Sequence, residues 1–181
     1  QELVDNFYTQ TLILLEAGVD LILLETAQDT RNIKAGTIGV HKAYQEFGKK
    51  LPLMISGTIE PMGTMLAGHN AEALVLSLQH LDLLSIGLNC ATGPELMTDH
   101  IRTIHELADC HVSCYPNAGL PDEEGKYLET PESLAKQIER FVDNGWINIM
   151  GGCCGTTNLH IQAMAQMIQG KKPRQTPHGT K

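Results

Sequence analysis

Residues 83–115 read LLSIGLNCATGPELMTDHIRTIHELADCHVSCY, and their pattern indicates the fold class. The first six, 83–88, are mostly apolar, which is typical of a strand buried on both faces. A helix is predicted over 94–108, with Pro94 at its first turn, where a helix leaves a backbone N–H unused. A second apolar run, 111–115, predicts another strand. A strand, a helix and a strand in this order form a parallel unit.

The same alternation continues on both sides of this unit, with apolar residues recurring at helical spacing between the apolar runs. The sequence predicts five strands, over 20–25, 51–56, 83–88, 111–115 and 147–150. It predicts six helices, over 3–17, 30–48, 70–78, 94–108, 130–145 and 158–168. This order predicts an α/β protein with a parallel sheet, which fits either an open doubly wound sheet or part of an eight-unit barrel.

Composition excludes two classes of partner. The chain has 181 residues, 42% of them hydrophobic, and a formal net charge of -8, which is typical of one globular domain. Its basic cluster at 171–174 is predicted to lie in a solvated, frayed end after Gly170, so no nucleic-acid partner is expected. Glu16, Asp20 and Glu25 interrupt the most apolar stretch, so no membrane-spanning helix is expected.

The cysteines indicate both a compartment and a site. There are five of them, an odd number, and no secretory signal precedes them, which predicts free thiols in the reducing cytoplasm. In parallel α/β folds, functional residues gather where strands end. Cys90 follows the third predicted strand, and Cys153 and Cys154 follow the fifth, so these three thiols should share one rim.

Three thiolates suit a zinc ion, which prefers four ligands in a tetrahedron, and they leave one position open for a substrate. Adjacent Cys153 and Cys154 would point oppositely in a straight strand, so the backbone must turn there. Glycines at 151, 152 and 155 permit such a turn. Spacing alone leaves two alternatives open, namely buried structural thiols and a redox pair.

Other polar residues have simpler interpretations. Cys110 and Cys114 are predicted to be small core residues, and His160 is predicted to be structural. Glu25 ends an apolar strand, where a carboxylate is costly unless it has a partner. The sequence leaves two roles open for it, a ligand-binding acid and a satisfied structural acid.

Five segments at the predicted rim resemble the homocysteine S-methyltransferase family, most closely the homocysteine-binding module of cobalamin-dependent methionine synthases. They are DLILLETAQDT (20–30), MISGTI (54–59), GLNCATGP (87–94), YPNAGLP (115–121) and GGCCGTT (151–157). The resemblance implies a (β/α)8 TIM barrel of which this chain supplies about the last five strand-helix units. It also implies a zinc site at Cys90, Cys153 and Cys154.

The activity implied by the resemblance is zinc-dependent methyl transfer to the thiol of homocysteine, giving methionine. Glu25 would contact the substrate ammonium group, and Ser56, Gly57 and Thr58 would line the pocket. Asn117 would lie near the open metal position, where it contacts substrate or occupies that position. The donor would be methylcobalamin held by another domain or protein; betaine and S-methylmethionine are the alternative donors.

The resemblance also implies that the front of the barrel is absent. The methyltransferase domain is expected to span 1–174, to be incomplete at its amino terminus, and to be followed by a tail over 175–181. Its expected partners are homocysteine, the cobalamin-bearing domain, and either the missing amino-terminal half or a second copy that covers the open sheet edges. The alternative from another class is a zinc-binding fragment without activity.

Overall fold

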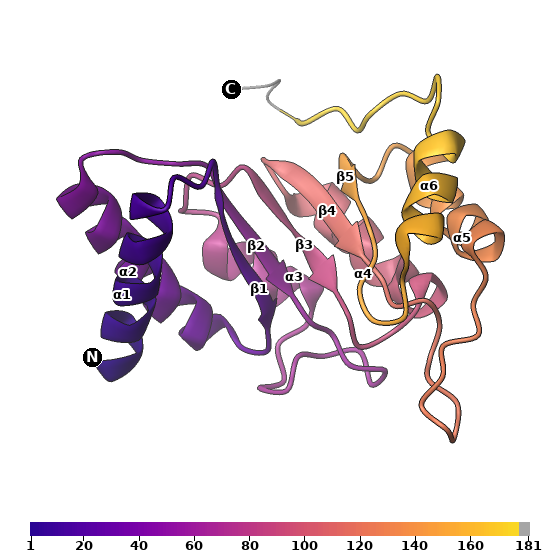
Figure 1. Ribbon diagram of the computed structural model, residues 1–181, viewed down its shortest axis with the longest axis horizontal. Helices are drawn as coiled ribbons and strands as arrows, with labels where there is room; N and C mark the ends of the chain where they lie inside the picture. The colour runs from indigo at the N-terminus through magenta and orange to yellow at the C-terminus, as the bar shows by residue number, and fades with distance from the viewer. Residues whose placement is uncertain (178–181) are drawn as a thin grey trace.

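The protein is described by a computed structural model covering residues 1–177, and its strands form one parallel sheet. The strands are β1 (Ile22–Ala27), β2 (Leu53–Gly57), β3 (Ser85–Asn89), β4 (His111–Tyr115) and β5 (Ile149–Met150). They lie in chain order, each hydrogen-bonded to the next (Figure 1). A doubly wound sheet reverses its order at a switch point, whereas a barrel does not. The prediction of a partial (β/α)8 barrel is therefore confirmed.

The helices form one layer. They are α1 (Glu2–Glu16), α2 (Thr30–Phe47), α3 (Ala71–Leu78), α4 (Pro94–Leu107), α5 (Pro131–Asp143) and α6 (Asn158–Met167). Each packs against the next helix along the chain, and in Figure 1 α3 and α4 lie behind the sheet, between α1–α2 and α5–α6. Three begin at side chains that accept a backbone N–H, those of Asp29, Asn70 and Thr130.

The main core lies between the sheet and this helical layer. Ile55, Ile86 and Val112 project from neighbouring strands into a cluster that includes Leu74 and Ile101 of the helices. Side chains alternate along a strand, so the residues between these apolar ones face the opposite, inner side of the sheet. Polar residues on that inner side therefore converge where the strands end.

The segment after α6 is ordered, contrary to the prediction of a solvated, frayed end after Gly170. Arg174 is only 3% exposed and donates hydrogen bonds to the carbonyl oxygens of His105, Ala108 and Cys110. The prediction failed because a short basic run does not reveal that the carbonyl groups at the end of α4 will accept hydrogen bonds from Arg174. The last four residues of the predicted tail over 175–181 lie outside the described residues.

The sheet has two open sides. Within the described residues β1 pairs only with β2, and β5 pairs only with β4. As expected for a barrel segment, the backbone groups along these two outer edges have no strand beside them. None of the helices in residues 1–177 combines the length and apolar character that crossing a bilayer requires.

Candidate metal centre

Three thiols meet at the carboxyl ends of β3 and β5. The Sγ atoms of Cys90 and Cys154 are 3.6 Å apart, those of Cys153 and Cys154 are 3.9 Å apart, and all three lie within 4.8 Å of one another. Within residues 1–177, this is the one group of His, Cys, Asp or Glu side chains whose ligand atoms converge so closely. The structure thus brings together the cysteines that the sequence places on one rim.

The remaining cysteines are core residues, as predicted. Cys114 is fully buried and contacts the sulfur of Met97, and burial raises the pKa of its thiol to about 12. Cys110 is partly buried against the same core, and burial also raises the pKa of its thiol. Neither thiol belongs to the group of converging ligand atoms at the rim.

Unusual backbone conformations direct the three thiols to one point. Cys90 and Ala91 both lie in the left-handed region, with φ of 62° and 59°, which side-chain-bearing residues rarely adopt. After β5 the chain turns, with the N–H of Thr156 donating to the carbonyl of Cys153. Gly155 lies within this turn and has φ of 80°. Such conformations persist only where the surrounding structure holds them, and they cluster at functional sites.

The donor set fits zinc. Four sulfurs at about 2.3 Å from a tetrahedral ion would lie about 3.8 Å apart, which matches the 3.6 and 3.9 Å spacings. All three thiols are free, so no disulfide explains their proximity. Burial, then the neighbouring Cys90, raises the pKa of Cys153 to about 11. A divalent cation at this point would favour the thiolate forms, so a soft, positively charged ligand suits the site.

Asn117, in the segment that follows β4, contacts the backbone of the Cys153–Cys154 pair. Its side chain is buried, and its Oδ1 accepts the backbone N–H of Cys154 at 3.1 Å. The neighbouring residues add two backbone bonds, from Cys153 to Pro116 at 2.8 Å and from Ala118 to Cys154 at 2.9 Å. The amide oxygen that would serve as a metal ligand is therefore engaged with the backbone. In this structure Asn117 orients the cysteines.

Asn89 lies at the end of β3, a position that the strand-end rule places at the rim, but the sequence assigns it no role. It is fully buried, and its amide contacts side chains from the ends of both β1 and β2. Its Nδ2 also lies 3.9 Å from the Sγ of Cys153. Asn89 thus links the thiols to the rest of the rim.

Tyr127 is a second residue that sequence reasoning missed. It belongs to a hairpin in which residues 121 and 127 form an antiparallel bridge. Its ring lies so close to Gly155 that a Cβ there would be 2.3 Å from the ring. Its pKa is raised by burial and by the nearby Cys154 thiol. The sequence gives no periodic signal for such a hairpin, which docks through tertiary contacts.

His160 is structural, as predicted. It is buried at the start of α6, where Nδ1 accepts the backbone N–H of Thr157 at 3.1 Å. Its Nε2 lies 2.9 Å from the carbonyl oxygen of Glu129.

The residues predicted to bind substrate divide into two groups. Ser56 and Thr58 are buried. The Ser56 hydroxyl donates to the Oδ1 of Asn89 at 2.6 Å, and the Thr58 hydroxyl donates to the backbone carbonyl oxygen of Asn89 at 3.2 Å. Gly57 instead faces α3, because a Cβ there would lie 2.9 Å from Leu74. Ser56 and Thr58 are thus part of the rim, and Gly57 packs against the helical layer.

Glu25 is exposed within the described chain, so its carboxylate is not desolvated there. Both roles that the sequence leaves open for it remain predictions. The charge of Glu25 adds to burial in raising the pKa of Tyr115, which lies at the end of β4. Both side chains therefore lie on the same inner side of the sheet.

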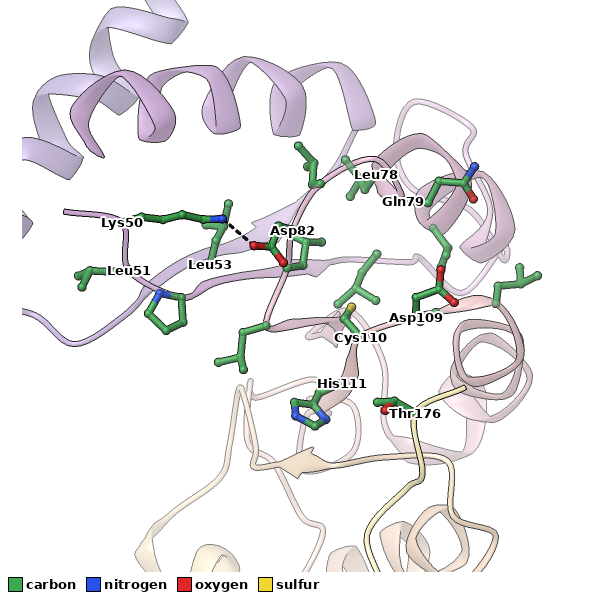
Figure 2. A pocket seen from close by; sticks show the side chains of 18 residues that line it. Lys50, Leu51, Leu53, Leu78, Gln79, Asp82, Asp109, Cys110, His111 and Thr176 are labelled. Atoms are coloured by element: carbon green, nitrogen blue, oxygen red, sulfur yellow. Dashed lines mark hydrogen bonds and ion pairs between the residues drawn. The ribbon is translucent and has the colours of Figure 1, made fainter. Parts of the chain in front are cut away.

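A cavity of about 460 Å³ lies away from these thiols (Figure 2). Seven of its 18 lining residues are leucines, and many of the 18 precede or begin β2, β3 and β4. The Lys50–Asp82 ion pair of 2.6 Å also lies there. Cys110 and His111 also line it. This is the amino-terminal end of the strands, the face that serves stability in barrels of this kind.

Comparison with known families agrees with the site. A family model described as homocysteine S-methyltransferase matches residues 1–168. The chain belongs to the homocysteine S-methyltransferase family. The family resemblance predicted from the sequence is thereby confirmed.

Solved structures of other proteins support the fold. The apo form of the homocysteine methyltransferase MmuM from Escherichia coli matches 91% of this chain with 22% identity and a TM-score of 0.68. Its metallated form matches 90%, with a TM-score of 0.66. A dipeptide epimerase from Enterococcus faecalis V583 matches with 10% identity and a TM-score of 0.58. The chain spans 57% and 51% of the two MmuM chains and 42% of the epimerase, so it corresponds to about half of a full barrel.

Proposed function

We propose that this chain is the thiol-activating part of a zinc-dependent homocysteine S-methyltransferase, in which Cys90, Cys153 and Cys154 hold the metal. The observation that carries the proposal is the convergence of the three free thiols at spacings suited to one tetrahedral ion. Membership of the family supplies the substrate class. The reducing cytoplasm is the compartment in which three free thiols persist.

A methyl group moves from the donor to the sulfur of homocysteine, so an S–CH₃ bond forms, the donor–CH₃ bond breaks and the thiol proton is released. When bound, zinc would supply Lewis acidity that lowers the pKa of the substrate thiol. The inner side of the sheet orients the amino acid. There Glu25 would attract the ammonium group of homocysteine. Ser56 and Thr58 would border the pocket, held in place by their hydrogen bonds to Asn89. Gly57 would support the same turn.

The test compares two amino acids that differ only at the reacting atom. We expect the zinc-loaded chain to bind L-homocysteine but to bind L-homoserine roughly tenfold more weakly or not at all, because a hydroxyl is a poor zinc ligand. Calorimetry on both ligands gives the ratio. Equal binding of the two would show that the thiol makes no contact with the metal centre.

The methyl donor requires its own assay. The resemblance to the cobalamin-dependent branch favours methylcobalamin carried by another domain; betaine and S-methylmethionine remain as rivals. Methionine formation from each donor, with the amino-terminal half of the barrel supplied, identifies which is used. Stoichiometric zinc without homocysteine binding would instead favour the inactive zinc-binding fragment.

A further inference from the structure

Asn89 lies at the centre of a hydrogen-bonded cluster that joins three strands. Its Oδ1 accepts from the Ser56 hydroxyl at 2.6 Å and from the backbone N–H of Thr26 at 3.1 Å. Its Nδ2 donates to the Thr26 hydroxyl at 2.8 Å and to the Sγ of Cys153 at 3.9 Å. These four contacts use both lone pairs and both hydrogens of the amide. A fully buried amide satisfied in this way has one orientation.

The contacts with Thr26 hold an irregular part of β1. Thr26 has φ of 57°, and the pairing of β1 with β2 shifts register between Leu24 and Ala27. A β-branched residue rarely adopts such a conformation without support. Asn89 supplies that support, because it binds both the backbone N–H and the hydroxyl of Thr26. The backbone conformation of Thr26, next to Glu25, is thus linked to the Asn89 amide, which also contacts Cys153.

We propose that Asn89 is a positioning residue that ties Cys153 to the ends of β1 and β2. Its two amide hydrogens divide between a β1 hydroxyl and the thiol. Loss of the hydroxyl contact removes one of the four contacts that fix the amide plane, and so weakens the constraint on the hydrogen that faces Cys153. The state of β1 is thereby transmitted to a metal-binding sulfur. This inference rests on the proposed metal centre, and groups that orient metal ligands commonly affect affinity strongly.

Three variants separate this role from a general effect on folding. Asn89→Ala removes the whole amide, and Thr26→Val removes only the exposed hydroxyl that Asn89 binds. Asn148→Ala is the matched control, because the Asn148 amide also joins separate segments, at the opposite end of the sheet. It accepts the N–H of Val112 at 3.0 Å and donates to the carbonyl oxygen of Arg174 at 2.9 Å. Zinc affinity is measured by competition with a chromophoric chelator. The visible spectrum of the cobalt(II)-substituted chain reports the geometry of the sulfur ligands.

Asn89→Ala should weaken zinc binding by roughly tenfold to a hundredfold, as loss of a ligand-orienting group does in other metal sites, and should change the cobalt spectrum. Thr26→Val should weaken zinc binding less. It should have no further effect in the Asn89→Ala background, because Thr26 acts through the same amide. Asn148→Ala should lower stability without changing zinc affinity or the spectrum.

Unchanged zinc affinity and an unchanged cobalt spectrum in Asn89→Ala would overturn the positioning role. So would a full Thr26→Val effect in the Asn89→Ala background, or an equal loss in Asn148→Ala. If Asn89→Ala does not fold, Thr26→Val alone decides, since an effect supports the link and no effect overturns it. Failure of the unmodified chain to bind zinc would overturn the metal centre itself, which is a different result.

Discussion

At the scale of residues, the three thiols converge because the backbone on both sides of the site is fixed. Cys90 takes up a left-handed conformation, and the turn at Cys153 and Cys154 is held by Asn117 and its neighbours. All of these features are dihedral angles of, or hydrogen bonds within, the chain itself. A site held by such contacts favours tight binding, because little further ordering is needed when an ion arrives.

Removing any one of the three thiols should sharply reduce zinc content. Each of Cys90→Ala, Cys153→Ala and Cys154→Ala leaves two sulfurs, too few for a site that depends on three protein ligands. Zinc per chain after dialysis is the measurement. Cys110→Ala and Cys114→Ala are the controls, and zinc retained at full stoichiometry in Cys153→Ala would rule out the assignment.

Zinc affinity should rise with pH. In the metal-free chain the pKa of Cys153 is raised to about 11, so this thiol is protonated between pH 6 and 8. Zinc binding must release that proton, so the apparent affinity should increase about tenfold per pH unit for each proton released. Chelator competition at pH 6, 7 and 8 checks this. Affinity independent of pH would mean that the thiols are not the ligands.

Glu25→Gln should weaken homocysteine binding and leave zinc bound. Because the carboxylate is exposed, the loss should be about 0.5–1 kcal/mol, the range of exposed ion pairs, and not the 1.5–3 kcal/mol of a well-shielded charged hydrogen bond. Calorimetry measures it. Glu16→Gln, an exposed change on α1, is the control, and equal affinities for the two variants would make Glu25 structural.

At the scale of elements, Arg174 connects the end of the chain to the end of α4. Arg174→Ala would leave carbonyl groups of His105, Ala108 and Cys110 without this donor, at a cost of about 1–3 kcal/mol. Urea unfolding measures the loss. Arg102→Ala, which removes only an exposed ion pair with Asp99, should change stability by about 0.5 kcal/mol or less. Equal effects would show that the Arg174 contacts do not stabilise the fold.

The sequence predicted the helices and strands better than it predicted how they are arranged in space. Apolar spacing located every helix and strand, and the strand over 111–115 agrees with β4 at both ends. Strand order could not be predicted, because periodicity reports which face of an element is buried and not which strand lies beside it. The same limit explains why the rim cysteines and Asn89 could be placed at strand ends, whereas the role of Asn89 and the position of Tyr127 could not be predicted. Their roles depend on contacts between segments far apart in sequence.

At the scale of the whole molecule, the partial barrel has two consequences for behaviour. The outer edges of β1 and β5 have no strand beside them in the described chain, and unpaired edges promote association. Sedimentation should therefore show concentration-dependent self-association, relieved when a polypeptide that completes the barrel is supplied. Methyl transfer by this chain alone should be very low. A stable monomer as active as the complete domain would contradict both expectations.

X-ray absorption at the zinc edge tests the metal centre most directly, because it counts sulfur ligands without requiring turnover. The purified chain should hold one zinc with three sulfurs at about 2.3 Å and one lighter ligand. The Cys153→Ala chain should not retain this signal. Fewer than three sulfurs in the unmodified chain, or the same three in Cys153→Ala, would contradict a centre built from Cys90, Cys153 and Cys154.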